Sequence, residues 1–228
     1  MQEKNAKESP IIQENLLAEL ESADYDRAQA YAKDLLAGLK IVRTFPQGVT
    51  VFGSARLKET NKYYRQARKL GELLAENGHT VITGGGPGLM EAVNKGVQKA
   101  KGKSIGICME FPEICIENEY IDKENHLLLS DFSARKYLFW KFANAFVALP
   151  GGLGTLDEIT ECLTLMQMKN IQQRPLILQD KKFWSGMAQW LENTLKNEYK
   201  TIRESDINLF EVTDNVNDTI TKITNKIK

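Results

Sequence analysis

From residue 49 onward, short apolar runs alternate with amphipathic segments, and this alternation constrains the fold more than any other feature of the chain. The apolar runs have the length and β-branched content of buried strands, and they lie near residues 49–53, 80–83, 104–109, 125–130, 145–149 and 175–179. The intervening segments have helical spacing and lie near residues 60–77, 88–100, 132–142 and 155–170. Such alternation predicts an α/β fold, a Rossmann-like doubly wound parallel sheet with helices on both faces.

Further helices are predicted at both ends of this core. Residues 11 to about 44 carry apolar positions such as Ile12, Leu16 and Leu20 at helical spacing, which predicts two helices. Helices are also predicted near 183–197 and 217–227, with a weak strand at Ile207–Val212. We therefore expect an N-terminal helical extension at residues 1–45 and a Rossmann-like domain at residues 46–228, without a linker that would divide the chain.

Charge and composition favour a small-molecule ligand over a polymer or a membrane. Thirty basic residues balance thirty acidic ones among the 228 residues, so neither a nucleic-acid surface nor an anionic-membrane surface is expected. The N-terminus is polar and no apolar stretch approaches the roughly 20 residues of a membrane span, so a cytoplasmic protein is predicted. Three cysteines, Cys108, Cys115 and Cys162, are expected to be reduced packing residues, and no metal site is predicted.

Three predicted strands end in turns that are rich in glycine. The first turn is Gly53-Ser54-Ala55, the second runs from Gly84 through Gly85 and Gly86 to Gly88, and the third is Pro150-Gly151-Gly152-Leu153-Gly154-Thr155. Any one of them could serve only to reverse the chain, because such corners often need a positive φ. Their shared position at strand ends, with a helix N-terminus behind them, favours a bound phosphate group.

Two common phosphate motifs are absent from these turns. The dinucleotide pattern GxGxxG fails because Leu89 and Asp157 stand where its last glycine is required. The GxxxxGK[ST] loop of nucleoside triphosphatases is also missing. A nucleoside monophosphate or a sugar phosphate remains as the expected ligand.

Charged residues stand beside the turns. Glu158 ends Thr155-Leu-Asp-Glu158, which has the form of a helix capping box, but it would face the ligand if a phosphate occupied the helix N-terminus. Arg135 and Lys136 follow the fourth predicted strand, and each is either part of an exposed basic pair or part of the site. Glu91 follows the second turn, where it is equally consistent with a ligand contact and with a surface carboxylate near a helix N-terminus.

These residues resemble the Lonely Guy (LOG) family, nucleoside 5′-monophosphate phosphoribohydrolases that often carry the label "possible lysine decarboxylase". The resemblance rests on four segments between residues 45 and 180: Gly53-Ser-Ala, Gly84-Gly-Gly-Pro-Gly-Leu-Met-Glu91, Arg135-Lys136 and the PGGxGTxxE signature, Pro150 to Glu158. Glu91 replaces a common glycine of the cytokinin-producing branch, and Asp131-Phe-Ser-Ala precedes the Arg-Lys pair in place of a frequent histidine or methionine. The preferred base, adenine or a modified adenine, stays open.

The resemblance implies roles for individual residues. Glu158 and Arg135 match the catalytic glutamate and arginine, Gly151 to Thr155 match the 5′-phosphate loop, and Lys136 is implied to lie in the nucleotide site. Gly53, Ser54, Gly85, Gly86, Glu91 and Pro150 complete the predicted substrate contacts. The family also implies a homodimer or an assembly of dimers, acting in cytokinin biosynthesis or as an AMP nucleosidase without metal or cofactor.

The expected reaction is hydrolysis of the N-glycosidic bond, with Glu158 stabilising the positive charge that develops on the ribose and activating water. The alternative is a non-catalytic carrier of a nucleotide or of molybdopterin cofactor with the same fold. A carrier needs the phosphate loop but not the carboxylate of Glu158.

Overall fold

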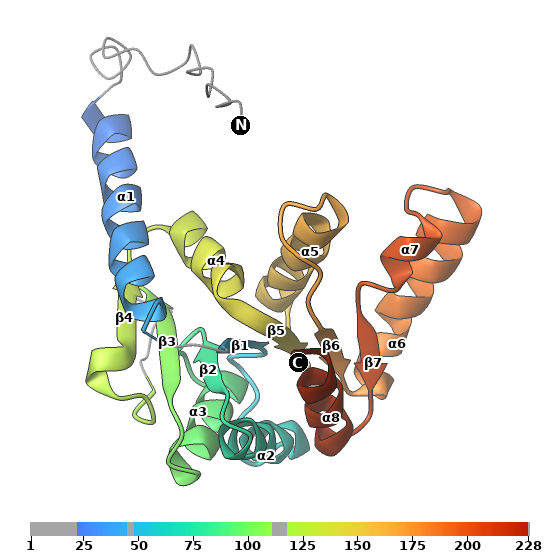
Figure 1. Cartoon of the computed structure of the whole chain (residues 1–228), viewed down its shortest axis with the longest axis horizontal. Coiled ribbons are helices and arrows are strands. Elements are labelled where there is room, and N and C mark those ends of the chain that lie inside the picture. The colour runs from blue at the N-terminus through green and yellow to red at the C-terminus, as the bar shows by residue number, and fades with distance from the viewer. Residues whose placement is uncertain (1–21, 45–47, 111–117, 228) are drawn as a thin grey trace, which may run out of the picture.

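The computed structural model describes residues 22–44, 48–110 and 118–227, and its centre is one seven-stranded sheet (Figure 1). The strand order is β4-β3-β2-β1-β5-β6-β7, and all neighbouring strands run parallel. The strands are β1 Gly48–Phe52, β2 Thr80–Thr83, β3 Ser104–Met109, β4 His126–Leu129, β5 Ala143–Ala148, β6 Leu176–Gln179 and β7 Glu211–Thr213. The Rossmann-like fold expected from the alternation is confirmed.

Helices connect most of the successive strands, as the spacing predicts. They are α1 Ser22–Val42, α2 Lys62–Glu76, α3 Leu89–Lys99, α4 Phe132–Lys141, α5 Leu153–Gln167, α6 Lys181–Trp190, α7 Glu204–Ile207 and α8 Val216–Ile227. A short 3₁₀ turn, Lys123–Asn125, precedes β4, and α6 continues into π-helical turns at Leu191–Glu198.

Three expectations need correction or fall outside the described residues. The weak strand at Ile207–Val212 is misplaced, because Ile207 ends α7 and β7 begins only at Glu211. The helix expected at 155–170 begins two residues earlier, at Leu153. The first of the two N-terminal helices, with Ile12, Leu16 and Leu20, lies outside the described residues.

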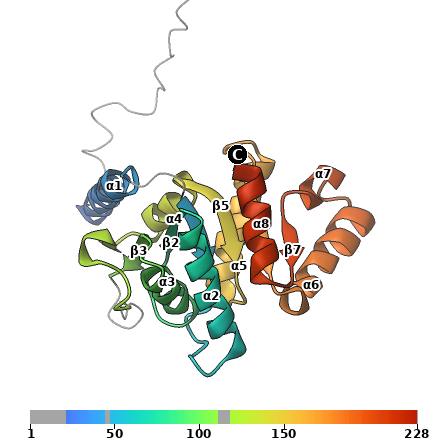
Figure 2. The same cartoon turned by 60° about the horizontal axis from the view of Figure 1, so that its bottom comes forward.

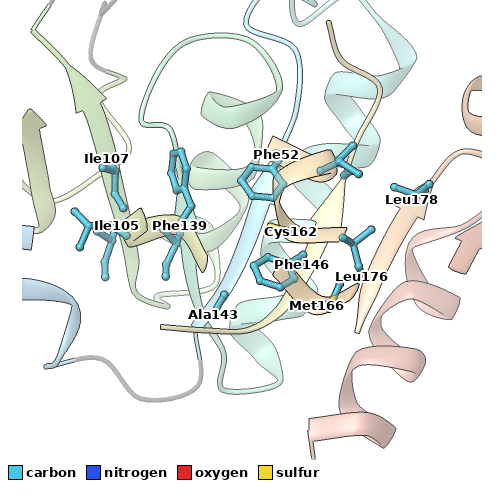
Figure 3. Close-up of a cluster of buried hydrophobic side chains, with 14 of the residues drawn as sticks. Phe52, Ile105, Ile107, Phe139, Ala143, Phe146, Cys162, Met166, Leu176 and Leu178 are labelled. Atoms are coloured by element: carbon cyan, nitrogen blue, oxygen red, sulfur yellow. The ribbon is translucent and has the colours of Figure 1, made fainter. Parts of the chain in front are cut away.

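The sheet is covered on both faces, and each face has its own hydrophobic core (Figure 2). Helices α2, α3 and α8 cover one face, while α4, α5 and α6 cover the other. Along β1, Val49 and Val51 pack on the first face and Phe52 on the second, which is why the run is apolar throughout. Figure 3 shows the second core, where Phe52, Phe139 and Phe146 meet.

Cys162 belongs to this second core, whereas Cys108 lies beside Gly84 and His126. Cys108 on β3 and Cys162 on α5 are both free, buried thiols, as expected, and burial raises the pKa of the Cys162 thiol. Cys115 lies outside the described residues. Within residues 22–44, 48–110 and 118–227, no helix has an apolar stretch long enough to cross a bilayer.

The order of the strands fixes where a ligand can bind. From β1 the chain moves outward through β2 and β3 to β4, and it then returns to place β5 on the other side of β1. The connections after β1 and β5 therefore leave in opposite directions, which opens a crevice at the carboxyl ends of these two strands. The first and third glycine turns follow these two strand ends.

Candidate active site

A cavity of about 570 Å³ lies at this crevice. Its walls come from the three glycine turns, from the end of β3, and from the first turns of α3, α4 and α5. The predicted site residues that line it are Gly53, Ser54, Gly86, Arg135, Gly152, Gly154, Thr155 and Glu158. Gly85, Glu91, Lys136, Pro150 and Gly151 were also predicted but do not line it.

Ser54 joins the three glycine turns to one another. Its backbone N–H donates to the Pro150 carbonyl oxygen at 3.1 Å, and its own carbonyl accepts from the Leu89 N–H at 2.9 Å. The Ser54 hydroxyl oxygen accepts from the Arg56 N–H at 3.1 Å. The turn after β1 thus connects the start of α3 to the third turn. Pro150 contributes to the shape of the site through its backbone.

Glycines of the second turn are required by local packing. Gly85 and Gly88 have φ values of +67° and +72°, which side chains rarely adopt, and a Cβ on Gly85 would lie 2.4 Å from Cys108 Sγ. The Asn118 side-chain amide donates to the carbonyls of Gly85 and Gly86 at 3.0 and 3.1 Å. A Cβ on Gly84 would lie 2.4 Å from Arg135 Nη2, so this glycine makes room for the arginine.

In the third turn, Gly152 and Gly154 are glycines that the fold itself does not require. Neither has a positive φ, and a Cβ on either would meet nothing within 4 Å. Gly151 differs, because its Cβ would lie 2.2 Å from Thr155 Oγ1. The bare backbone at Gly152 and Gly154 leaves space for close approach of a ligand.

The start of α5 rules out the capping box. Gly152 is the N-cap and makes no side-chain capping bond, while Thr155 is buried within the first turn. The N–H groups of the first turn have no acceptor within the helix, and the helix dipole places partial positive charge there. Glu158 lies one turn further along and is available for another role.

Glu158 is partly buried at the wall of the cavity. Burial raises the pKa of its carboxyl to about 7, with smaller contributions in the same direction from Asp157 and Glu161, whereas Arg135 and Lys136 act in the opposite sense. Its protonation therefore changes near neutral pH, as is common for acid–base groups in active sites.

Arg135 is held in place from two sides. Its Nε donates to the Ile107 carbonyl oxygen at 2.8 Å, and its guanidinium lies 5.0 Å from the centre of the Phe139 ring. Its Nη2 atom lies against Gly84, and the charge of the guanidinium lowers the pKa of Glu158. Arg135 and Glu158, which are 23 positions apart in sequence, are thus brought to one cavity by α4 and α5.

Lys136 faces the neighbouring helix. Its ammonium lies 2.9 Å from Asp157 Oδ1 and 3.6 Å from Glu161 Oε2. Burial opposes its charge, but these two carboxylates outweigh burial and raise the pKa of Lys136. Lys136 is therefore placed to act on α5 and its carboxylates.

Glu91 is placed by a contact between helices. Its Oε1 accepts a hydrogen bond of 2.5 Å from the hydroxyl of Tyr64, a buried residue of α2. Burial, followed by this hydrogen bond, raises the pKa of the Tyr64 hydroxyl. The bond joins α2 to α3 and gives the carboxylate of Glu91 a partner within the fold.

Several cavity residues were absent from the predicted site. These are Ala55, Arg56, Gly84, Pro87, Met90, Met109, Phe132 and Leu153. Leu153 and Phe132 are 86% and 45% exposed at the cavity, so they form an apolar part of its surface open to solvent. Among the described residues, no group of three His, Cys, Asp or Glu side chains could hold a metal ion.

Comparison with known proteins places this arrangement in a family. A family model described as "Possible lysine decarboxylase" matches residues 90–223, more than half of the chain. A cytokinin riboside 5′-monophosphate phosphoribohydrolase of Rhodococcoides fascians is 27% identical over 152 residues, covering 66% of this chain and 77% of that protein. A Mycobacterium tuberculosis protein of the same name is 28% identical over 158 residues, covering 68% and 81%.

Solved structures share the fold. The molybdenum cofactor carrier protein of Chlamydomonas reinhardtii aligns with a TM-score of 0.60 at 22% identity, covering 79% of this chain and 97% of that one. The molybdenum cofactor binding protein of Rippkaea orientalis aligns with a TM-score of 0.57 at 24% identity, covering 79% and 96%. Because the family model matches more than half of the chain, the chain belongs to the LOG family, described as "Possible lysine decarboxylase".

Proposed function

We propose that this protein hydrolyses the N-glycosidic bond of a nucleoside 5′-monophosphate of the AMP or cytokinin ribotide type, releasing the free base and ribose 5-phosphate. The observation that carries the proposal is the presence of Glu158 and Arg135 in the same cavity as the open Gly152–Gly154 backbone. The named phosphoribohydrolase relatives support the same class of reaction.

The 5′-phosphate belongs at the start of α5. The backbone there is free of side chains at Gly152 and Gly154, so the N–H groups of the first helical turn are open to phosphate oxygens. Thr155 follows in the same turn and also lines the cavity. Binding energy from this non-reacting end of the substrate would place the glycosidic bond beside Glu158.

Glu158 then provides the reacting carboxylate. As the bond between C1′ and the base nitrogen breaks, positive charge grows on the ribose, and an ionised carboxylate stabilises it. The water oxygen attacks C1′, one water proton passes to Glu158, and the base leaves with the electrons of the broken bond. That proton then passes from Glu158 to the base, directly or through solvent, which restores the carboxylate. Arg135 keeps Glu158 ionised and oriented, or contacts the departing base. The proposed mechanism uses no metal or cofactor.

A non-catalytic carrier of a nucleotide-like cofactor is the second candidate, because carriers of molybdenum cofactor share this fold. The environment of Glu158 favours the enzyme. A carboxylate whose pKa is raised to about 7 by burial costs stability near neutral pH and would repel an anionic ligand, so a pure carrier would gain from its absence.

The test is incubation of the protein with a panel of nucleoside monophosphates, followed by chromatographic separation of free bases. We expect base release from AMP or an N6-modified relative and much slower release from the matching nucleoside, which lacks the phosphate. Binding without release of base from any member of the panel would support the carrier. The homodimer or assembly of dimers that the family implies is part of this proposal, and the exposed Leu153 and Phe132 are available to a partner at the cavity.

A further inference from the structure

Asp34, on the N-terminal helix α1, binds the segment from which α4 starts. Its Oδ2 accepts three hydrogen bonds: from Ser130 N–H at 2.6 Å, from the Ser130 hydroxyl at 2.9 Å, and from Asp131 N–H at 2.8 Å. Two of these donors are backbone groups, so the carboxylate fixes the course of the chain between β4 and α4. Figure 1 shows α1 beside β4 and α4.

The segment that Asp34 holds is the N-cap of α4. Asp131 is the capping residue, and its Oδ1 accepts from the N–H groups of Ser133 and Ala134 at 2.7 and 3.0 Å. The Arg135 N–H donates to the Asp131 carbonyl at 3.3 Å and closes the first turn of the helix. A chain of hydrogen bonds therefore leads from Asp34 through Asp131 to the backbone of Arg135.

A second contact between the two helices lies about one turn further along α1 and about two turns further along α4. Gly38 of α1 packs so closely on α4 that a Cβ there would lie 2.1 Å from Leu138 Cδ1. Leu138 is fully buried and lies three residues after Arg135, close to one helical turn. Helix α1 thus touches α4 on both sides of Arg135, whereas Leu36, on another face of α1, is 68% exposed.

Arg135 cannot readily compensate for a shift of α4, because its own partners confine its side chain. The Nε bond to Ile107 and the approach to Gly84 leave the guanidinium little room to follow a shifted helix. A displacement of the first turn of α4 would weaken that bond and move the guanidinium relative to Glu158.

We propose that Asp34 is a positioning residue for Arg135, and that α1 acts on the site through the cap of α4. This inference rests on the proposed function for its kinetic readout, but its spectroscopic readout does not depend on turnover. It assigns a role in the reaction to the helical extension, which lies outside the cavity.

The test compares Asp34→Ala and Asp34→Asn with Asp26→Ala, which removes an exposed carboxylate from the same helix. Far-UV circular dichroism and thermal unfolding establish that each variant is folded. In Asp34→Ala we expect kcat for base release from AMP to fall by about tenfold or more, with KM changed much less, because a misplaced catalytic group costs turnover. Asp34→Asn keeps an acceptor oxygen and should recover part of kcat, while Asp26→Ala should match the parent protein.

The second readout is the NMR signal of the Arg135 Nε–H, assigned by its loss in Arg135→Lys, together with hydrogen exchange at the Ser130 and Asp131 amides. Asp34→Ala should shift or broaden the Arg135 signal and speed exchange at both amides, and Asp26→Ala should leave them unchanged. If the parent protein releases no base, the proposed function fails, but these signals still test the inference. An unchanged Arg135 signal in Asp34→Ala, or an equal kcat loss in Asp26→Ala, overturns it.

Discussion

Replacing Glu158 by glutamine should stabilise the fold, and the gain should grow with pH. The native carboxyl has a pKa raised from 4.5 to about 7, chiefly by burial. Between these two values the native state retains a proton that the unfolded chain has released, so stability falls as pH rises through this window. The full difference corresponds to about 3 kcal/mol, and solvent at the cavity wall reduces it. We expect the advantage of Glu158→Gln to rise from under about 1 kcal/mol at pH 5 to about 2 kcal/mol at pH 8.

The assay is urea unfolding of the parent protein and of Glu158→Gln at pH 5, 6, 7 and 8, with the free energy of unfolding taken from each curve. Effects of the amide that do not depend on pH cancel when the difference between the two proteins is followed across the series. Glu76→Gln, at an exposed position of α2, is the matched control and should show no trend. A difference that stays constant from pH 5 to pH 8, or that shrinks as pH rises, would refute the assignment of Glu158 as a carboxyl whose pKa is raised by burial.

Two further substitutions test the proposed phosphate site at Gly152–Gly154 and the role of Lys136. Gly154→Ala should leave stability unchanged or raise it by up to about 1 kcal/mol, because alanine suits a helix better, yet it should weaken AMP binding at least tenfold in calorimetry. Gly186→Ala, also in open space but on α6, should leave the affinity for AMP unchanged. Equal affinities in the two variants would contradict a phosphate site at Gly152–Gly154. Lys136→Gln removes a cation that lowers the pKa of Glu158, so the acidic limb of the pH–kcat profile should move to higher pH. Lys141→Gln on the same helix is its control, and an unmoved limb in Lys136→Gln would contradict this electrostatic role.

The fold could be predicted because a sheet buried on both faces leaves a strong pattern in sequence. Runs such as 104–109 are buried at every position and mostly apolar, and the helices between them keep a polar face. The start of α5 could not be placed in the same way, because two glycines in Gly152-Leu-Gly154 disfavour a helix. The structure has helix from Leu153 onward, so tertiary packing of the later apolar positions, such as Ile159, overrides local propensity.

The candidate site was predictable where its chemistry has a local signature. Glycine turns at strand ends mark the phosphate side of the cavity, and the signature that ends at Glu158 marks its carboxylate. Met90, Met109 and Phe132 could not be found, because their apolar side chains follow the same pattern as core residues. Lys136 and Glu91 depend on partners contributed by other helices, Asp157 and Tyr64, and no single segment contains that information.

The most direct test of the proposed reaction is a comparison of AMP cleavage by the parent protein and by Glu158→Gln at pH 8, with adenine and ribose 5-phosphate both quantified. We predict equal amounts of the two products from the parent protein, and loss of turnover in Glu158→Gln by at least about a hundredfold. AMP should still bind to the variant, because the proposed phosphate site at Gly152–Gly154 is intact. Unchanged turnover in Glu158→Gln, or parent protein that binds AMP without releasing adenine, would contradict the proposed mechanism.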